Sequence, residues 1–300
     1  MIRPIILIGM NRSGTKWVSN IICGHADVIG VQSRRTGGIL ETNMFGAMQD
    51  KFDPAVPDDY IGLVELWART EFFRRTGLDK DMLYSLSPRP RSVLRLFEVV
   101  LDEVARRNGK SYWLQKTSPP NASTVLEHFT NARIVVVRRN LLDTVRSMLG
   151  LQSRRGTRSL FRATYRYVYQ KKLLDRICRH HPVIEMHYEA LRANPESEKA
   201  RLFARLGLDA GRVSPEDPFP RNTSFASEAQ RRDIMPRRDR LLVRVLAVVI
   251  DLLPLPVISA AVVLRGFSLG RKSRPLVADT FGELGDRLAD RSGGSVHPDR

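Results

Sequence analysis

A short polar loop near the start of the chain has the residue types that bind an anion. It lies between Gly9 and Gly14, after four apolar residues that suit a buried strand, and apolar positions recur at helical spacing from Thr15 onward. A loop that ends at a helix N-terminus directs unpaired N–H groups and the positive end of the helix dipole at one point. Arg12 adds a fork of N–H donors and Ser13 a hydroxyl. The stretch therefore predicts a site for phosphate or a similar anion.

The spacing of the two glycines matches the nucleotide-binding P-loop, but the residues that follow do not. That motif, G-x-x-x-x-G-K-[S/T], has Lys directly after the second Gly, whereas here the order is Thr15-Lys16. A shift of one residue rotates a side chain by about 100° around a helix, so Lys16 does not point where the P-loop lysine points. The cation inside this loop is Arg12 instead.

A second stretch combines a buried strand, two arginines and a helix. The apolar run of residues 134–137 predicts a central parallel strand that ends at Arg138 and Arg139, and a helix is predicted from Leu141. Arg139 supplies a guanidinium at the strand end, a group that binds phosphate as a bidentate fork, and Ser147 lies eight residues later on the predicted helix. Arg138 alternates away from Arg139 and is expected to serve structure or add to the positive field. A P-loop kinase needs an acid at this strand end to hold magnesium, which counts against that function.

Together the two stretches resemble the nucleotide-binding segments of sulfotransferases that use 3′-phosphoadenylyl sulfate (PAPS). RSGTKWVSNI resembles their 5′-phosphosulfate loop, and the pair Arg139 and Ser147 resembles their 3′-phosphate site. The resemblance implies that Trp17 stacks on adenine, as in cytosolic members. Lys16 stands where a second Thr is commoner, which puts one hydroxyl contact in question. The implied cofactor is PAPS, with no metal, and the implied binding residues are Arg12, Ser13, Gly14, Thr15, Lys16, Trp17, Arg139 and Ser147.

Two further residues resemble catalytic groups of this family. Glu41 follows the first helix, where Golgi-type and tyrosylprotein sulfotransferases have the Glu that takes the acceptor proton. The sequence KTSP from Lys116 resembles the Lys-Thr/Ser-Pro motif of carbohydrate sulfotransferases, whose Lys lies near the sulfuryl group. With Arg12, these are the implied catalytic residues. Two alternatives stay open: Glu41 as a helix N-terminal acid paired with Arg34 or Arg35, and Lys116 as a surface lysine at a turn.

Other segments of the resemblance are expected to be structural. Tyr188 and Glu189 belong to a segment similar to the family's Tyr-Glu-x-Leu and are predicted to pack and to begin a helix. His25, after the first helix, is predicted to cap rather than to catalyse. Asn222 and Ser224 resemble a turn that follows in many relatives, where they would touch the nucleotide.

The elements that position these residues alternate between strand and helix. We predict an α/β fold in three layers, α/β/α, with a central parallel sheet similar to that of P-loop NTPases and an α-helical C-terminal appendage. Residues 50–110 are predicted to be mostly helical and to form the wall of the acceptor pocket. The resemblance covers about residues 3–226. The predicted organisation is a sulfotransferase domain at 1–226, an apolar and basic helical extension at 227–290 and a disordered tail at 291–300.

The extension contains an apolar stretch at residues 241–264 that the resemblance does not explain. Arg244, Asp251, Pro254 and Pro256 interrupt it, which makes a single membrane-spanning helix costly. Two short helices joined at Leu-Pro-Leu-Pro are predicted instead. They are expected to lie on an anionic membrane surface as a peripheral contact or to pack on the catalytic domain, and a true span is the least favoured alternative.

Composition sets wider limits on the function. The 300 residues carry a formal net charge of +17, which suits nucleic acid, anionic lipid or a polyanionic nucleotide. No nucleic-acid module is recognisable, so nucleic acid is not expected as a partner. We expect a cytoplasmic enzyme without a signal peptide, with Cys23 and Cys178 as inert thiols. The predicted acceptor is a carbohydrate or glycolipid hydroxyl, then a small metabolite or phenol. The alternative functions are a P-loop small-molecule kinase and a basic membrane-associated protein without enzymatic activity.

Overall fold

Five parallel strands form the central sheet of the computed structural model, which describes residues 2–33, 35, 37–42, 44–153, 159–214 and 234–264. Strand β1 lies in the middle because its apolar run is buried on both faces, as the sequence predicts. The register pairs Leu7 with Lys116 on one side of β1 and Gly9 with Val137 on the other. All carboxyl ends therefore meet at one edge. In spatial order the strands are β2 (Val28–Ile29), β5 (Tyr112–Thr117), β1 (Arg3–Gly9), β6 (Arg133–Arg138) and β7 (Val183–His187).

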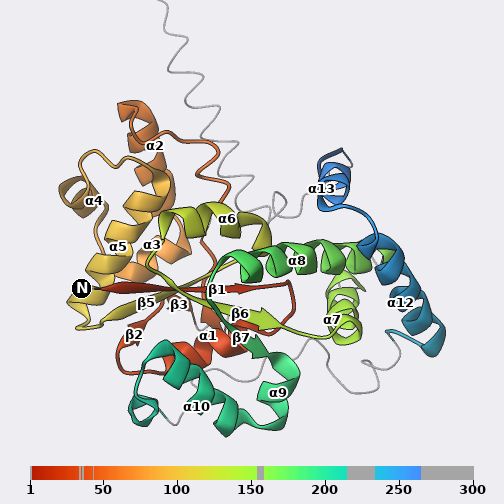
Figure 1. Cartoon of the computed structure of the whole chain (residues 1–300). Coiled ribbons are helices and arrows are strands. Elements are labelled where there is room, and N and C mark those ends of the chain that lie inside the picture. Colours follow the sequence, from red (N-terminus) through yellow and green to blue (C-terminus); the bar gives the residue numbers. More distant parts are fainter. Residues whose placement is uncertain are drawn as a thin grey trace, which may run out of the picture. The chain divides into compact units, whose positions relative to one another are not determined.

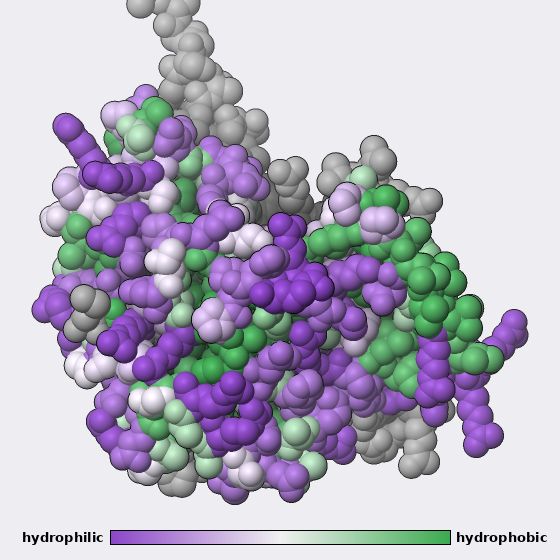
Figure 2. Space-filling model, viewed as in Figure 1, coloured by the Kyte–Doolittle hydropathy of each residue, from purple (hydrophilic) through white to green (hydrophobic). Residues whose placement is uncertain are grey.

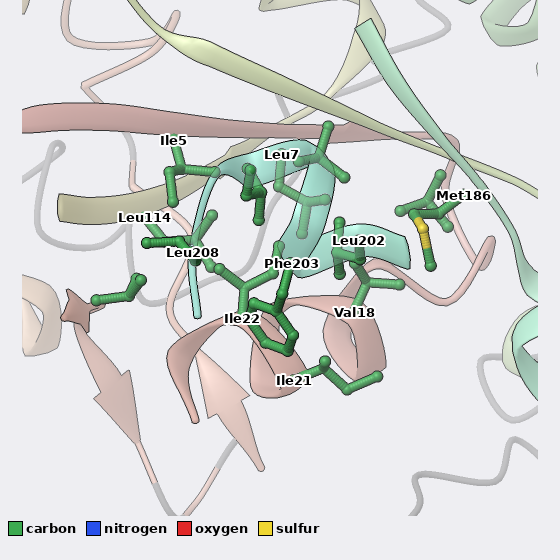
Figure 3. Close-up of a cluster of buried hydrophobic side chains, with 14 of the residues drawn as sticks. Ile5, Leu7, Val18, Ile21, Ile22, Leu114, Met186, Leu202, Phe203 and Leu208 are labelled. Atoms are coloured by element: carbon green, nitrogen blue, oxygen red, sulfur yellow. The ribbon is translucent and has the colours of Figure 1, made fainter. Parts of the chain in front are cut away.

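One face of the sheet is covered by α1 (Thr15–Cys23) and α10 (Pro195–Leu206), on the side opposite α6 and α8 in Figure 1. The alternation of the strands sends Ile5 and Leu7 to this face, where they meet Phe203 of α10 (Figure 3). The three-layer α/β/α architecture with a parallel sheet is thereby confirmed.

The other face is covered by α5 (Val93–Arg107), α6 (Pro119–His128) and α8 (Leu160–His180), and Figure 1 shows α6 and α8 lying over the strands. Trp113 of β5 packs edge-on against Phe97 of α5, with 6.0 Å between ring centroids. The remaining helices of the domain are α2 (Pro57–Ala68), α3 (Glu71–Thr76), α4 (Lys80–Leu86), α7 (Leu141–Ser153), α9 (Tyr188–Ala193) and the short 3₁₀ helix η1 (Ala210–Arg212).

The predicted helical content of residues 50–110 is confirmed by the four helices α2 to α5. Gly77 caps α3 in the left-handed conformation, with φ of 70°, as a glycine at a helix C-terminus is expected to do. The sequence did not predict the antiparallel pair β3 (Gln32–Ser33) and β4 (Gly38–Ile39). Strands of two residues are too short to show an alternating pattern.

His25 is structural, as predicted. Its buried ring lies 2.9 Å from the carbonyl oxygen of Asp209 through Nε2, and its Nδ1 accepts a hydrogen bond from the backbone N–H of Asp27. The prediction of inert thiols also agrees with the fold, because burial raises the pKa of Cys23 to about 12 and raises that of Cys178.

The C-terminal helices are α12 (Arg237–Asp251) and α13 (Leu255–Leu264), which confirms the two short helices expected from the apolar stretch. Helix α12 belongs to the compact unit Met1–Leu253, where it packs against α8 and α7, and α13 belongs to a second unit, Pro254–Arg300. In the described part of the chain no helix is long and apolar enough to cross a membrane. The expected boundary at residues 226/227 and the expected tail at 291–300 lie outside the described residues.

Candidate functional site

The loop between β1 and α1 is held in a conformation that few residues adopt. Arg12 has φ of 69° and Gly14 has φ of 100°, both in the left-handed region. Backbone strain of this kind in a non-glycine residue is typical of functional sites. The loop also folds back over Gly9, where an added Cβ would lie 2.3 Å from Cγ2 of Thr15 and 2.8 Å from Oγ of Ser13. Both glycines of the predicted motif are therefore required by the geometry.

The hydroxyl of Ser13 is suited to an anionic ligand. Ser13 is fully buried, and its Oγ has no hydrogen-bond partner within the described part of the structure. A buried polar group is normally satisfied, so a ligand oxygen is the natural partner here. The N-cap residue of α1 is Gly14, which has no side chain to occupy the N-terminus of the helix. Thr15 and Lys16 form the first turn of α1, and the stem of Lys16 runs beside Gly38 of β4.

Arg139 and Ser147 lie together with the loop, as the sequence predicts. Nε of Arg12 donates to Oγ of Ser147 at 3.0 Å, and Nη1 of Arg139 donates to the carbonyl oxygen of Arg12 at 3.0 Å. Ser147 is almost fully buried on α7. The two segments that the sequence analysis assigned to separate phosphates are thus joined directly. Two guanidinium groups and two hydroxyls from these segments gather at the carboxyl edge of β1 and β6.

Tyr188 has a role at the site that the sequence did not predict. It begins α9 directly after β7, as predicted, and its ring packs against the loop. The guanidinium carbon of Arg139 lies 4.1 Å from its ring centroid, and a Cβ on Gly14 would lie 2.4 Å from its Cδ2. The available signal was its position, because the residue after a parallel strand lies at the same edge as the loop.

Trp17 lies on the first turns of α1, partly buried against the core below the loop. Its ring meets Tyr188 edge to face, with centroids 5.6 Å apart. The aromatic surface beside the anion-binding groups therefore consists of Trp17 and Tyr188 together. The stacking of Trp17 on adenine stays a prediction.

Glu41 and Lys116 form an ion pair on the other side of the loop. Oε1 of Glu41 lies 3.0 Å from Nζ of Lys116, and the side chain of Glu41 is 81% exposed while that of Lys116 is only 10% exposed. The backbone next to Glu41 is anchored, because Nε2 of Gln115 donates a hydrogen bond to the carbonyl oxygen of Leu40 at 3.1 Å. Of the alternative partners for Glu41, Arg35 pairs with a different acid and Arg34 lies outside the described residues.

Helix α8 supports both anion-binding segments from behind. The amide oxygen of Gln170, which is 1% exposed, accepts a hydrogen bond from the backbone N–H of Asn11 at 2.9 Å. One turn earlier, the hydroxyl of Tyr167 donates to the carbonyl oxygen of Arg139 at 3.3 Å. Burial raises the pKa of Tyr167 to about 12, so the hydroxyl stays protonated at neutral pH. Sequence patterns did not indicate either residue.

Arg138 is structural, in agreement with the alternation of the strand. It forms ion pairs with Asp175 of α8 and Glu185 of β7, which tie the sheet to the helix layer. Within the described residues, no group of three or more His, Cys, Asp or Glu side chains is arranged to hold a metal ion. Asn222 and Ser224, which the sequence analysis assigned to a nucleotide-binding turn, lie outside the described residues.

Comparison with known proteins identifies a family. Residues 4–211 match the sulfotransferase family. No curated protein matches the chain. Solved structures that resemble it include the sulfotransferase domain from the Synechococcus PCC 7002 olefin synthase, with 16% identity, a TM-score of 0.49 and coverage of 84% of this chain and 96% of that one.

Two further solved structures are similar over comparable lengths. The sulfotransferase domain from the curacin biosynthetic pathway has 14% identity and a TM-score of 0.47, with 77% of this chain and 82% of that chain covered. Sulfotransferase STF1 from Mycobacterium tuberculosis H37Rv has 14% identity and a TM-score of 0.40, with 87% and 76% covered.

Proposed function

The chain belongs to the sulfotransferase family, and on that premise we propose that it transfers a sulfuryl group from PAPS to an acceptor hydroxyl. One observation carries the proposal. Two hydrogen bonds link the loop at Arg12 to Arg139 and Ser147. The groups suited to two separate phosphates of one nucleotide therefore form one connected site. A nucleotide with phosphates at both ends of its ribose fits such an arrangement.

The residues present fit PAPS in three respects. The buried, unpartnered Oγ of Ser13 and the left-handed Gly14 suit a 5′-phosphosulfate that approaches the backbone closely, with Arg12, Thr15 and Lys16 in the same loop. Arg139 and Ser147 would hold the 3′-phosphate through a guanidinium fork and a hydroxyl. Trp17 would contact adenine, with Tyr188 as a second ring beside it. No metal ion is part of the proposal.

PAPS, when bound, supplies an activated sulfuryl group whose leaving group is adenosine 3′,5′-bisphosphate (PAP). The carboxylate of Glu41 would take the proton of the acceptor hydroxyl. Lys116 and Arg12 would offset negative charge on the transferred group and on the bridging oxygen. Glu41 pairs with Lys116 at 3.0 Å and its side chain is 81% exposed, so the carboxylate is open to an acceptor that approaches from solvent.

For the acceptor we favour a hydroxyl of a carbohydrate or glycolipid. The support is the pair of Glu41 and Lys116, which resembles the carbohydrate-acting branch of the family and lies open to solvent on one side. A phenol or other small metabolite is the second choice, because Trp17 resembles the cytosolic branch. Incubation with PAPS and a panel of glycans, glycolipids and phenols, followed by mass spectrometry, distinguishes the two classes.

The experiment that tests the proposal is a calorimetric titration of Arg139→Ala with PAP. Loss of charge-assisted hydrogen bonds should weaken binding by about ten- to a hundredfold. The matched control is Arg192→Ala, an exposed arginine on α9, which should bind PAP like the wild type. If the wild type and Arg139→Ala bind PAP equally, or neither binds it, the proposal is wrong.

A further inference from the structure

Helix α12 has two apolar sides, and within the described residues one of them packs on the rest of the domain. Its inner side packs on α8 and α7 through Val243 and Ile250, which are buried, and Nζ of Lys172 donates to the carbonyl oxygen of Asp251 at 2.7 Å. Its outer side is an apolar patch, visible over α12 in Figure 2. The six residues of this outer face are 47% to 79% exposed: Leu241, Leu242, Val245, Val248, Val249 and Leu252.

The outer face is one continuous stripe with cationic borders. At about 100° per residue, its six side chains occupy about 120° of the helix circumference. Three exposed arginines adjoin the stripe, Arg237 and Arg238 in the first turn and Arg244 along one edge. Scattered exposed apolar residues are ordinary, but six exposed apolar residues contiguous on one helix face are typical of an interaction surface.

We propose that the outer face of α12 docks on an anionic lipid bilayer, with the apolar stripe entering the boundary between headgroups and acyl chains. Apolar side chains beside arginines are the composition of helices that lie in the plane of a membrane surface. The anionic lipid headgroups would pair with the exposed guanidinium groups of Arg237, Arg238 and Arg244. This docking is independent of the sulfotransferase proposal.

The charges argue against a second copy of the chain as the occupant. A symmetric contact through this face would bring the arginines of α12 near those of the other copy, on molecules with a net charge of +17 each. The helix offers little compensation, since its only acids are Asp239, which is half-buried, and Asp251, which pairs with Lys172 at 3.4 Å. An anionic surface has no such conflict.

Helix α13 has a composition that suits the same environment. Its ten residues, Leu255–Leu264, include no charged side chain. A bilayer span needs about 20 residues, so a helix of this length is suited to lie at the surface of a membrane rather than to cross it.

The test is flotation of the full chain with liposomes, one set of phosphatidylcholine alone and one of equal parts phosphatidylcholine and phosphatidylglycerol. Binding is expected only to the anionic liposomes and should weaken in 1 M salt, where the screening length falls to about 3 Å. A variant with Leu241→Gln, Val245→Gln and Val248→Gln should lose binding. A variant with Arg237→Gln, Arg238→Gln and Arg244→Gln should bind about a hundredfold more weakly, at about fivefold per arginine.

The matched control carries Val56→Gln and Ile61→Gln, two apolar residues of similar exposure near and on α2, and should float like the wild type. Three results would overturn the proposal. The first is equal binding to both liposomes or none to either. The second is a dimer of the wild type, seen by light scattering, that the three glutamines convert to a monomer. The third is a lowered melting temperature of the glutamine variant without any change in flotation, which would assign the face to another segment of the chain. None of these measurements involves PAP or an acceptor, so their outcome is independent of the proposed sulfotransferase activity.

Discussion

The two sides of the loop at Arg12 are built very differently. On the side of β6 and β7, Arg139 contacts the loop carbonyl, the ring of Tyr188 and the hydroxyl of Tyr167. On the side of β5, Glu41 is 81% exposed and forms an ion pair with Lys116. The first side is therefore held by several contacts before any ligand binds, whereas the carboxylate on the second side is open to solvent.

This difference assigns nucleotide binding to the first side and acceptor binding to the second. Preorganised groups reduce the free energy lost on ordering when a ligand binds, which suits a nucleotide that is the same in every reaction cycle. The exposed carboxylate of Glu41 suits an acceptor that arrives and leaves on the open side. We therefore expect substitutions on the two sides to separate nucleotide binding from sulfuryl transfer.

The largest expected effect is that of Glu41→Gln on transfer. Removal of a general base should lower the rate of sulfuryl transfer by about 10²–10⁴-fold, while PAP affinity stays at the wild-type value. The measurement is the transfer rate to an acceptor identified by the panel, beside calorimetry with PAP. Glu65→Gln is the control, because Glu65 is also ion-paired at the surface, 2.6 Å from Lys80. A transfer rate unchanged in Glu41→Gln would remove Glu41 from the chemistry.

Gly14→Ala should have the second-largest effect, which is a loss of stability together with weaker PAP binding. The left-handed φ of 100° and the 2.4 Å approach of a Cβ to Tyr188 together predict a loss of about 1–3 kcal/mol in the free energy of unfolding, with weaker PAP binding. Gly77→Ala is the matched control, since Gly77 has φ of 70° but nothing within 4 Å of an added Cβ. It should lower the melting temperature and leave PAP affinity unchanged. Equal effects of both variants on PAP affinity would contradict the contact with Tyr188.

Tyr167→Phe should have the smallest effect, and this effect should be confined to nucleotides that carry a 3′-phosphate. Loss of its hydrogen bond to the carbonyl oxygen of Arg139 should weaken PAP binding by about two- to tenfold. Binding of adenosine 5′-monophosphate, which lacks the 3′-phosphate that Arg139 would hold, should not change. Tyr169→Phe on the same helix is the control for both ligands. A parallel loss for both nucleotides would indicate a general structural role for Tyr167.

Local patterns in the sequence predicted the parts of the site that lie within one strand–loop–helix unit. Arg12, Ser13 and Gly14 belong to one such unit and Arg139 and Ser147 to another, so local spacing together with the family resemblance singled out each set. The parallel sheet then explains why both sets meet, because the carboxyl ends of β1 and β6 are neighbours.

The contacts that the sequence did not predict are those between distant elements. Asn11 and Gln170 are 159 positions apart, and Gln170 lies in a helix whose pattern indicates only a buried side. The contact of Tyr188 with Gly14 likewise depends on how β7 and α9 lie beside the loop. The stretch at residues 241–264 was recognised as apolar, but which side of α12 packs on α8 depends on tertiary structure.

The most direct test of the central proposal is the thermal stability of the wild type with PAP and, in parallel, with Mg-ADP. A ligand at a hundredfold excess over its dissociation constant stabilises the folded state by about 2.7 kcal/mol. The proposed role of Arg139 and Ser147 predicts a clear rise in melting temperature with PAP and none with Mg-ADP. Stabilisation by Mg-ADP alone would contradict it and would favour a kinase-type nucleotide site.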